Sequence, residues 1–481
     1  MAAKFSLDEI VLATGGVLDK PCGMNETVYG ISTDTRTLTS GDAFFALIGE
    51  NHDAHDHLDK AAEMGATLLV VNNAEKVPRD YSGAVMIVED TLMAYQSVAA
   101  YYRKRLDPLV IAVTGSVGKT TVKDMIAWIL SDRVFTYSTK GNINNQIGLP
   151  RTILEAEEGT RVLVLEMGLA TVGDIKRLAD IARPDIAVIT NIGVAHRENF
   201  DTDDGILKAK FEVTSYMDEK SALVIDVGGS KEVADYAEEN RADIGYKLLS
   251  DFSISTVRVD EKDAGVSVFE IQETGSGISI PFSIPLPGPH AGISTALAAV
   301  CCIRAGEMLG EKITLADVAN SLKGLERTRH RLEPISAGDI LVIDDTYNAS
   351  PDSAKAGLNY LKSVPAKRRF AILADMNELG YLSEEMHERL GEAAVLAGAD
   401  LICAFGTKAK SIAEGAKQAL KKTGTKADEE VLWFDADDKD ALIECVQNKA
   451  SKGDVIYIKG SRAMKMEDVV YALTKGKGGN D

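Results

Sequence analysis

Cysteine and positive charge are both scarce in this chain of 481 residues. The five cysteines stand in no C-x-x-C spacing, and so sparse and odd a set favours reduced core thiols over a disulfide or zinc framework. The 53 Lys and Arg residues are outnumbered by 73 Asp and Glu residues, which gives a net charge of −20 and opposes binding to a nucleic acid backbone. We therefore expect no nucleic acid partner, and any phosphate ligand must be held by a local site.

Long apolar runs are also absent. No segment approaches the roughly 20 unbroken apolar residues that a membrane span requires. The opening stretch MAAKFSLDEIVLATGG carries an acidic pair where a signal peptide would need its apolar region. These features predict a soluble, cytoplasmic protein without membrane insertion.

Short β-rich runs alternate with helical stretches in two series along the chain. The first contains LVIAVTG, TTVKDMIAWIL, RVLVLEMG and DIAVITNIG, and the second contains DILVIDD, RFAILAD, DLICAFG and DVIYIKG. This alternation is typical of βαβ units and parallel sheets. We predict an α/β fold of three domains, with the boundaries 1–107, 108–332 and 333–481. The Gly- and Pro-rich stretch before residue 293 should form strands or loops that precede a helix beginning near Ile293.

A glycine-rich segment lies between an apolar strand and an amphipathic helix and has the features of a phosphate-binding loop. Its glycines let the backbone approach an anion, its lysine supplies a cation, and the first threonine after the lysine can ligate Mg²⁺. A Gly-rich turn without a ligand is the alternative, and Val113 replaces the first glycine of the usual motif. The candidate ATP-binding residues here are Thr114, Gly115, Ser116, Val117, Gly118, Lys119, Thr120 and Thr121.

Several polar residues follow predicted strands, where ligands gather in open α/β sheets. Glu166 and His196 occupy such positions and could ligate a metal or simply form hydrogen bonds. Asp344 and Asp345 could begin a helix turn or hold a ribose or a cation. Lys210 has the local pattern of a solvated surface lysine.

In this order, the motifs resemble the Mur ligase family over almost the whole chain, and within it the MurF type. Ser32-Thr33-Asp34-Thr35-Arg36 is similar to the family's S-T-D-S-R, and the stretch from Gly141 to Pro150 is similar to G-N-x-N-N-x-I-G-x-P. Asp344 to Pro351 resembles D-D-x-Y-N-A-N-P. The segment from His290 to Ser294 departs from the family's H-N-x-x-N, because Ala291 and Ser294 replace the two asparagines.

The resemblance implies a role for each matched residue. It implies ATP contacts for the glycine-rich loop and for His290, Arg331, Asp345 and Asn348, and magnesium contacts for Thr120, Glu166, His196 and a carbamylated Lys210. It makes Lys119, His196 and Lys210 the catalytic residues. The implied substrate-binding residues are Ser32, Thr33, Asp34, Arg36, Asn142, Asn144 and Asn145.

The implied activity is ATP- and Mg²⁺-dependent ligation of D-alanyl-D-alanine to UDP-N-acetylmuramoyl-tripeptide (UDP-MurNAc-tripeptide) by a monomer, through an acyl phosphate. Another Mur-type or polyglutamate-adding amide ligase is the nearest alternative. A P-loop NTPase that acts as a switch, or a catalytically silent scaffold, would be alternatives outside that class.

Overall fold

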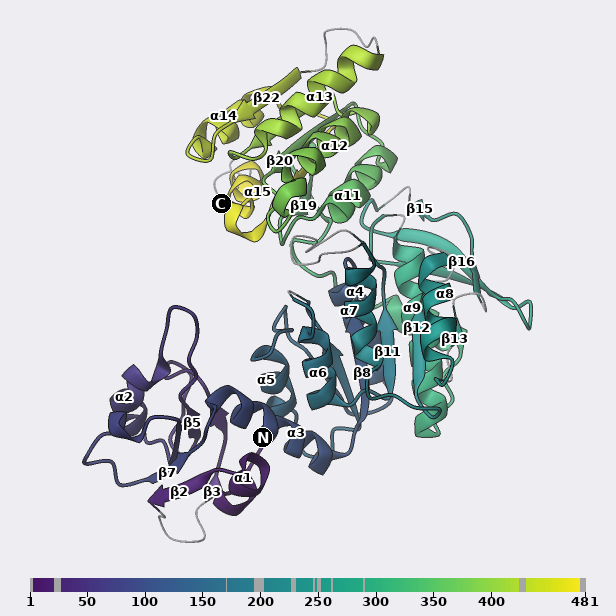
Figure 1. Ribbon diagram of the computed structural model, residues 1–481. Helices are drawn as coiled ribbons and strands as arrows, with labels where there is room; N and C mark the ends of the chain where they lie inside the picture. The colour runs from purple at the N-terminus through teal and green to yellow at the C-terminus, as the bar shows by residue number, and fades with distance from the viewer. Residues whose placement is uncertain are drawn as a thin grey trace.

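The computed structural model describes residues 3–20, 27–169, 171–193, 203–225, 231–244, 247–248, 252–260, 263–288, 290–423 and 430–475. Three α/β parts follow one another along the chain (Figure 1), with the N-terminal part at the lower left, the central part at the right and the C-terminal part at the top. The α/β prediction is confirmed by the largely parallel sheets of all three parts. The domain boundaries stay a prediction.

The N-terminal part is built on a five-stranded sheet of order β2-β7-β6-β5-β4. Strands β4 to β7 are parallel, and β2 pairs antiparallel with β7 at one edge. A two-stranded antiparallel pair, β1 with β3, lies beside α1. The elements are β1 (Phe5–Ser6), α1 (Leu7–Thr14), β2 (Val17–Lys20), β3 (Thr27–Val28), β4 (Ile31–Ser32), β5 (Ala43–Phe45), α2 (Leu58–Glu63), β6 (Leu68–Val71), β7 (Ala84–Ile87) and α3 (Thr91–Leu106).

The central part has a six-stranded parallel sheet of order β13-β12-β11-β8-β10-β9. Because β8 lies between β10 and β11, the carboxyl ends of these three strands meet at one edge, where open α/β sheets bind ligands. The elements are β8 (Leu109–Thr114), α4 (Lys119–Ser131), β9 (Thr136–Ser138), α5 (Gly148–Glu155), β10 (Val162–Glu166), α6 (Asp174–Ala182), β11 (Ile186–Ile189), α7 (Asp203–Phe211), β12 (Ala222–Ile225), α8 (Lys231–Arg241) and β13 (Lys247–Leu248).

A small antiparallel sheet and two helices complete the central part. Its strands are β14 (Phe252–Ile254), β15 (Arg258–Val259), β16 (Ser267–Glu273) and β17 (Ser279–Ile284), and its helices are α9 (Ala291–Leu309) and α10 (Leu315–Leu322). Strand β17 confirms the strand predicted in the Gly- and Pro-rich stretch, and α9 begins two residues before the expected Ile293. Helix α9 is the one described helix long and apolar enough to cross a membrane, and 67% of its apolar window is buried in the molecule.

The C-terminal part has a six-stranded sheet of order β18-β19-β23-β20-β21-β22, parallel except for β18. Strand β19 lies beside β23, so their carboxyl ends are adjacent. The elements are β18 (Glu333–Ala337), β19 (Ile340–Asp345), α11 (Pro351–Ser363), β20 (Arg368–Ala374), α12 (Ser383–Leu396), β21 (Leu401–Phe405), α13 (Lys410–Thr423), β22 (Glu430–Phe434), α14 (Lys439–Lys449), β23 (Asp454–Lys459) and α15 (Glu467–Lys475).

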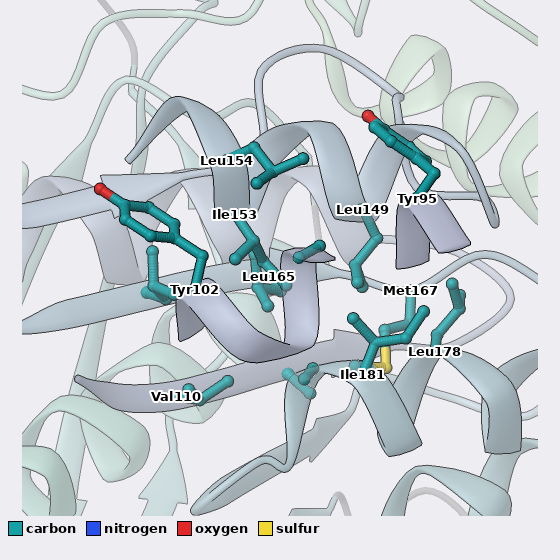
Figure 2. Close-up of a cluster of buried hydrophobic side chains, with 14 of the residues drawn as sticks. Tyr95, Tyr102, Val110, Leu149, Ile153, Leu154, Leu165, Met167, Leu178 and Ile181 are labelled. Carbon is teal, nitrogen blue, oxygen red and sulfur yellow. The ribbon is translucent and has the colours of Figure 1, made fainter. Parts of the chain in front are cut away.

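One hydrophobic core joins the N-terminal part to the central sheet. Tyr95 and Tyr102 of α3 lie in the same cluster as Ile153 of α5 and Leu178 of α6 (Figure 2). The Tyr102 hydroxyl also donates a hydrogen bond of 2.8 Å to the carbonyl of Ala156, so this large ring is buried without losing its polar partner. Helix α3, which ends just before the predicted boundary at residue 107, is therefore packed against the central part.

Candidate active site

The loop between β8 and α4 has the backbone that its glycines predict. Gly115 and Gly118 have φ values of 145° and 85°, in the region that side chains disfavour. A side chain at Gly115 would also collide with Thr190 Oγ1. Lys119 Nζ curls back over the loop and donates a hydrogen bond of 2.8 Å to the carbonyl of Gly115. Burial lowers the pKa of Lys119, and nearby Arg331 lowers it further.

Three motifs that are far apart in the sequence meet at Glu166. Its Oε2 accepts a hydrogen bond of 2.8 Å from Thr120 Oγ1, and its Oε1 accepts one of 2.8 Å from Asn144 Nδ2. Arg331 Nη2 in turn donates to Thr120 Oγ1 over 3.0 Å. Thr120 and Glu166 are both buried and offer a hydroxyl and a carboxylate, which are oxygen donors of the kind that Mg²⁺ prefers. The residues present therefore fit a magnesium ion.

Two residues at the end of β11 support the loop, and our sequence reasoning missed both. Thr190 Oγ1 donates a hydrogen bond of 2.6 Å to the carbonyl of Val117. Asn191 Oδ1 accepts one of 2.8 Å from the amide of Val117 and one of 3.1 Å from the amide of Ser116. The rule that pointed to Glu166 could have found them, because they follow a strand whose carboxyl end lies at the same sheet edge.

Lys210 is not the solvated lysine that its local pattern suggests. It lies on α7 and is 1% exposed. Burial, and to a smaller extent the charge of Lys119, lowers its pKa to about 7. The interpretation as a surface lysine is wrong because the position depends on how α7 packs, which local sequence does not reveal. His196 lies outside the described residues, so its role stays a prediction.

Arg331 is held in position by the backbone on either side of it. His330 and Leu332 have φ values of 61° and 49°, which are uncommon for residues with side chains. The guanidinium lies 4.2 Å from the centre of the Tyr347 ring, and its buried Nε has no hydrogen-bond partner among the residues that the structure describes. Arg331 stands two residues before β18, the first strand of the C-terminal part, so its side chain links the start of that part to the loop.

The two carboxylates at the end of β19 have separate partners. Asp344 Oδ2 lies 2.7 Å from His330 Nδ1, and Asp344 Oδ1 accepts a hydrogen bond from Thr346 Oγ1. Asp345 Oδ2 forms an ion pair of 2.5 Å with Lys459 and accepts a hydrogen bond of 2.9 Å from Tyr457. Neither carboxylate caps α11, whose N-cap is Ser350, although the segment that they begin does lead into this helix.

Two other predicted ATP-binding residues, His290 and Asn348, come before and after this pair in the sequence. Asn348 follows it and is exposed. His290 stands just before α9, and its buried Nδ1 has no hydrogen-bond partner within the described part of the chain. Burial lowers the pKa of His290, against the charge of Asp345, which raises it. The Asp345 carboxylate therefore acts electrostatically on the His290 ring.

The predicted substrate residues fall into two groups. On the N-terminal part, Arg36 forms an exposed ion pair of 2.6 Å with Asp34 and holds the pKa of that carboxyl at about 2. The backbone amide of Asp34 also donates a hydrogen bond of 3.3 Å to Ser32 Oγ, and Thr33 lies between these two residues in the sequence. Ser32 ends β4 and the other three residues follow it, and none of the four makes a described hydrogen bond to the glycine-rich loop.

The second group lies in the segment before α5. Asn144 reaches Glu166, as described above, and Asn145 Oδ1 accepts a hydrogen bond of 2.8 Å from the amide of Gly148 at the start of α5. Asn142 is exposed. The structure therefore brings Asn144 directly into the candidate site, while Asn145 supports the helix that follows.

Comparison with known proteins identifies the class to which this fold and site belong. The Mur ligase middle domain matches residues 113–303, and the glutamate ligase domain of Mur ligases matches residues 330–462. The chain is 34% identical to UDP-N-acetylmuramoyl-tripeptide–D-alanyl-D-alanine ligase of Bacillus subtilis over 98% of both chains. It is 35% identical to the enzyme of the same name from Escherichia coli, over 94% of this chain and 95% of that one. The chain therefore belongs to the Mur ligase family.

Solved structures of the MurF type share the whole architecture. A MurF crystal structure from Acinetobacter baumannii has a TM-score of 0.86 at 28% identity and covers 98% of this chain and 99% of its own. MurF from Thermotoga maritima, solved in complex with ADP, has a TM-score of 0.78 at 27% identity and covers 93% of this chain and 97% of its own. These likenesses agree with the resemblance drawn from the sequence motifs.

Proposed function

We propose that this protein ligates D-alanyl-D-alanine to UDP-N-acetylmuramoyl-tripeptide in the cytoplasm, with ATP converted to ADP and phosphate. The observation that carries the proposal is the meeting of Thr120, Glu166 and Arg331. Their hydrogen bonds join the phosphate-binding loop, the carboxyl end of β10 and the segment just before β18 into one site. A ligase needs such a site because it must hold a nucleotide while two other substrates react.

The first step forms an acyl phosphate. The terminal carboxylate of the tripeptide attacks the γ-phosphorus of ATP, a C–O–P linkage forms, and the bond to the β–γ bridging oxygen breaks to release ADP. Two anions are forced together in this step, so concentrated positive charge lowers its barrier. Lys119 and Arg331 supply fixed charge beside the loop. Mg²⁺, when held by Thr120, Glu166, His196 and a modified Lys210, would add to that charge.

The second step forms the amide. The neutral amine of the dipeptide attacks the acyl carbon, the C–N bond forms, and phosphate leaves as the C–O bond breaks. The proton that the amine loses goes to the departing phosphate or to solvent. Because the amine must be unprotonated when it attacks, we expect a mildly alkaline optimum. Keeping water from the acyl phosphate requires the C-terminal part to close on the loop, and Arg331 already makes a contact of that kind.

Lys210 is proposed to react with carbon dioxide. An amine with a pKa of about 7 is substantially neutral at physiological pH, and the neutral form is the nucleophile that can bond to the carbon of CO₂. The product is a carbamate, which is an anion, and the proton lost goes to solvent. This reaction would turn a buried cation near Lys119 into a ligand for a metal ion.

The remaining predicted contacts complete the proposal. Ser32, Thr33, Asp34 and Arg36 would hold the uridine nucleotide, and Asn142, Asn144 and Asn145 would contact the muramoyl-peptide. His290, Asp345 and Asn348 would approach the nucleotide from the other side. We expect the enzyme to work as a monomer.

Phosphate release from ATP and Mg²⁺ tests the proposal. It should require both UDP-MurNAc-tripeptide and D-alanyl-D-alanine, and mass spectrometry should find the joined UDP-pentapeptide. Lys119→Ala should lower the rate by about 10²–10³. Lys231→Ala is the matched control, because Lys231 lies on the exposed face of α8. Release that is indifferent to both substrates, with no joined product, would instead support an NTPase switch.

A further inference from the structure

The amides that should receive a phosphate already share one acceptor in this structure. The backbone N–H groups of Ser116 and Val117 both donate to Asn191 Oδ1, over 3.1 and 2.8 Å. Two successive amides that converge on a single oxygen form an anion-binding concavity of the kind that phosphate loops use. The amide oxygen of Asn191 therefore occupies a position suited to a phosphate oxygen.

The bonds around Asn191 show how it is placed. The Ser116 amide also donates to the backbone carbonyl of Asn191 over 3.1 Å, and Ser116 Oγ accepts a hydrogen bond of 2.8 Å from the amide of Gly193. These contacts tie the loop to the backbone that follows β11 whatever the Asn191 side chain does. The Asn191 side chain is exposed, so it can leave the loop amides without crossing packed protein.

We propose that Asn191 is a phosphate surrogate, which holds the two amides convergent while the loop is empty and yields them to the nucleotide. This inference rests on the nucleotide use in the proposed function and assigns Asn191 a positioning role in it. A neutral amide oxygen suits the exchange, because hydrogen bonds to a charged phosphate are roughly twice as strong as those to a neutral acceptor. The phosphate therefore displaces the side chain, while the empty loop avoids unsatisfied amides.

Two substitutions separate this role from a permanent structural one. Asn191→Ala removes the surrogate, so the amide of Val117 should exchange hydrogen about tenfold faster or more in the nucleotide-free protein, while the Ser116 amide keeps its bond to the backbone carbonyl of residue 191. ADP affinity should stay within about threefold of the wild type, because the nucleotide brings its own acceptor. Asn191→Asp keeps the acceptor but gives it charge, so the empty loop should stay protected while ADP binds at least about tenfold more weakly.

The test combines amide hydrogen exchange of the nucleotide-free protein with calorimetric titration of ADP. Asn320→Asp is the matched control for added charge, since Asn320 is an exposed residue of α10. Melting temperatures of all variants should match the wild type. The expected order of ADP affinity is Asn191→Ala above Asn191→Asp. The reverse order, in which Ala loses ADP and Asp restores it, would overturn the surrogate role and assign Asn191 a permanent one.

Unchanged exchange of the Val117 amide in Asn191→Ala would also overturn the inference. These outcomes are distinct from a failure of the proposed function. If the wild-type protein binds no ADP, the nucleotide site itself is wrong. If the wild type binds ADP and only the order of the variants is reversed, the site stands and the surrogate role does not.

Discussion

Arg331 Nη2 lies 3.0 Å from Thr120 Oγ1, which places a guanidinium from the C-terminal part against the first turn of α4. Thr120 Oγ1 accepts this hydrogen bond while it donates its own hydrogen to Glu166. A single hydroxyl thus connects the Arg331 guanidinium to the Glu166 carboxylate. The contact joins the residues just before β18 to the phosphate-binding loop.

Replacing Arg331 should therefore impair catalysis more than folding. We expect Arg331→Met to lower kcat for ATP-dependent ligation by about 10²–10³, as loss of one charged stabilising donor does in other enzymes. Steady-state kinetics with both substrates measures the effect. Arg304→Met is the control, because Arg304 is a partly exposed residue of α9 paired with Glu307. Equal losses in the two variants would contradict a specific role for Arg331.

The Asp345–Lys459 pair should matter for stability, because it is buried. Lys459→Met leaves the Asp345 carboxylate without its cation, and such an uncompensated charge costs about 3–5 kcal/mol of unfolding free energy. The double variant Asp345→Asn with Lys459→Met removes both charges and should recover part of the loss. Urea unfolding of the single and double variants provides the comparison. No recovery in the double variant would mean that packing, not charge, dominates this position.

Lys210 should make activity respond to carbon dioxide. Removing CO₂ from the buffer should reduce wild-type activity, and added bicarbonate should restore it, more fully above pH 7 than below it because only the neutral amine reacts. Lys210→Arg cannot form the carbamate, so it should lose about 10² in kcat and ignore bicarbonate. Exposed Lys208 on the same helix gives the control variant Lys208→Arg. A fully active Lys210→Arg would reject the modification.

His387 should make the C-terminal part sensitive to acid. Its Nε2 accepts a hydrogen bond of 2.9 Å from the amide of Met376, and its Nδ1 lies 2.6 Å from the carbonyl of Ser383, so the ring is held neutral. Burial lowers its pKa in the folded protein. The unfolded chain then binds the extra proton first, so stability falls as pH drops below about 6.5.

The steepness with which stability falls as pH drops tests whether His387 causes this acid sensitivity. Between pH 6.5 and the lowered pKa of His387, the wild type should lose about 1.4 kcal/mol of unfolding free energy per pH unit through this residue. His387→Gln keeps an acceptor that does not titrate, so its stability should depend less on pH in this window, even if it is lower overall. Denaturant unfolding at several pH values between 5 and 7.5 measures both slopes. Parallel slopes would show that His387 is not responsible.

Local sequence was enough to predict the elements whose pattern is self-contained. The predicted amphipathic helix after the glycine-rich loop is α4, and its residues Val122, Met125 and Ile126 are all 0% exposed. Glu166 ends its strand at the expected sheet edge, because a buried apolar run followed by an acid and a glycine has few other arrangements. The glycines of the loop likewise have the backbone that their position requires.

Residues defined by long-range packing could not be predicted in this way. The burial of Lys210 depends on how α7 lies against the rest of the central part, and its two neighbours in sequence give no sign of it. The support that Asn191 gives the loop depends on β11 being the neighbour of β8, a feature of sheet order. The positive φ values of His330 and Leu332 occur where the chain passes from the central part to the C-terminal part, and no local sequence motif predicts them.

The shared core around α3 also bears on how the protein can be divided for experiments. A fragment ending at residue 107 would carry Tyr95 and Tyr102 away from Ile153 and Leu178, which would leave an apolar surface on each piece. Such fragments should aggregate when expressed alone. The first two parts are thus better produced as one polypeptide, because a cut between them would divide the hydrophobic core that they share.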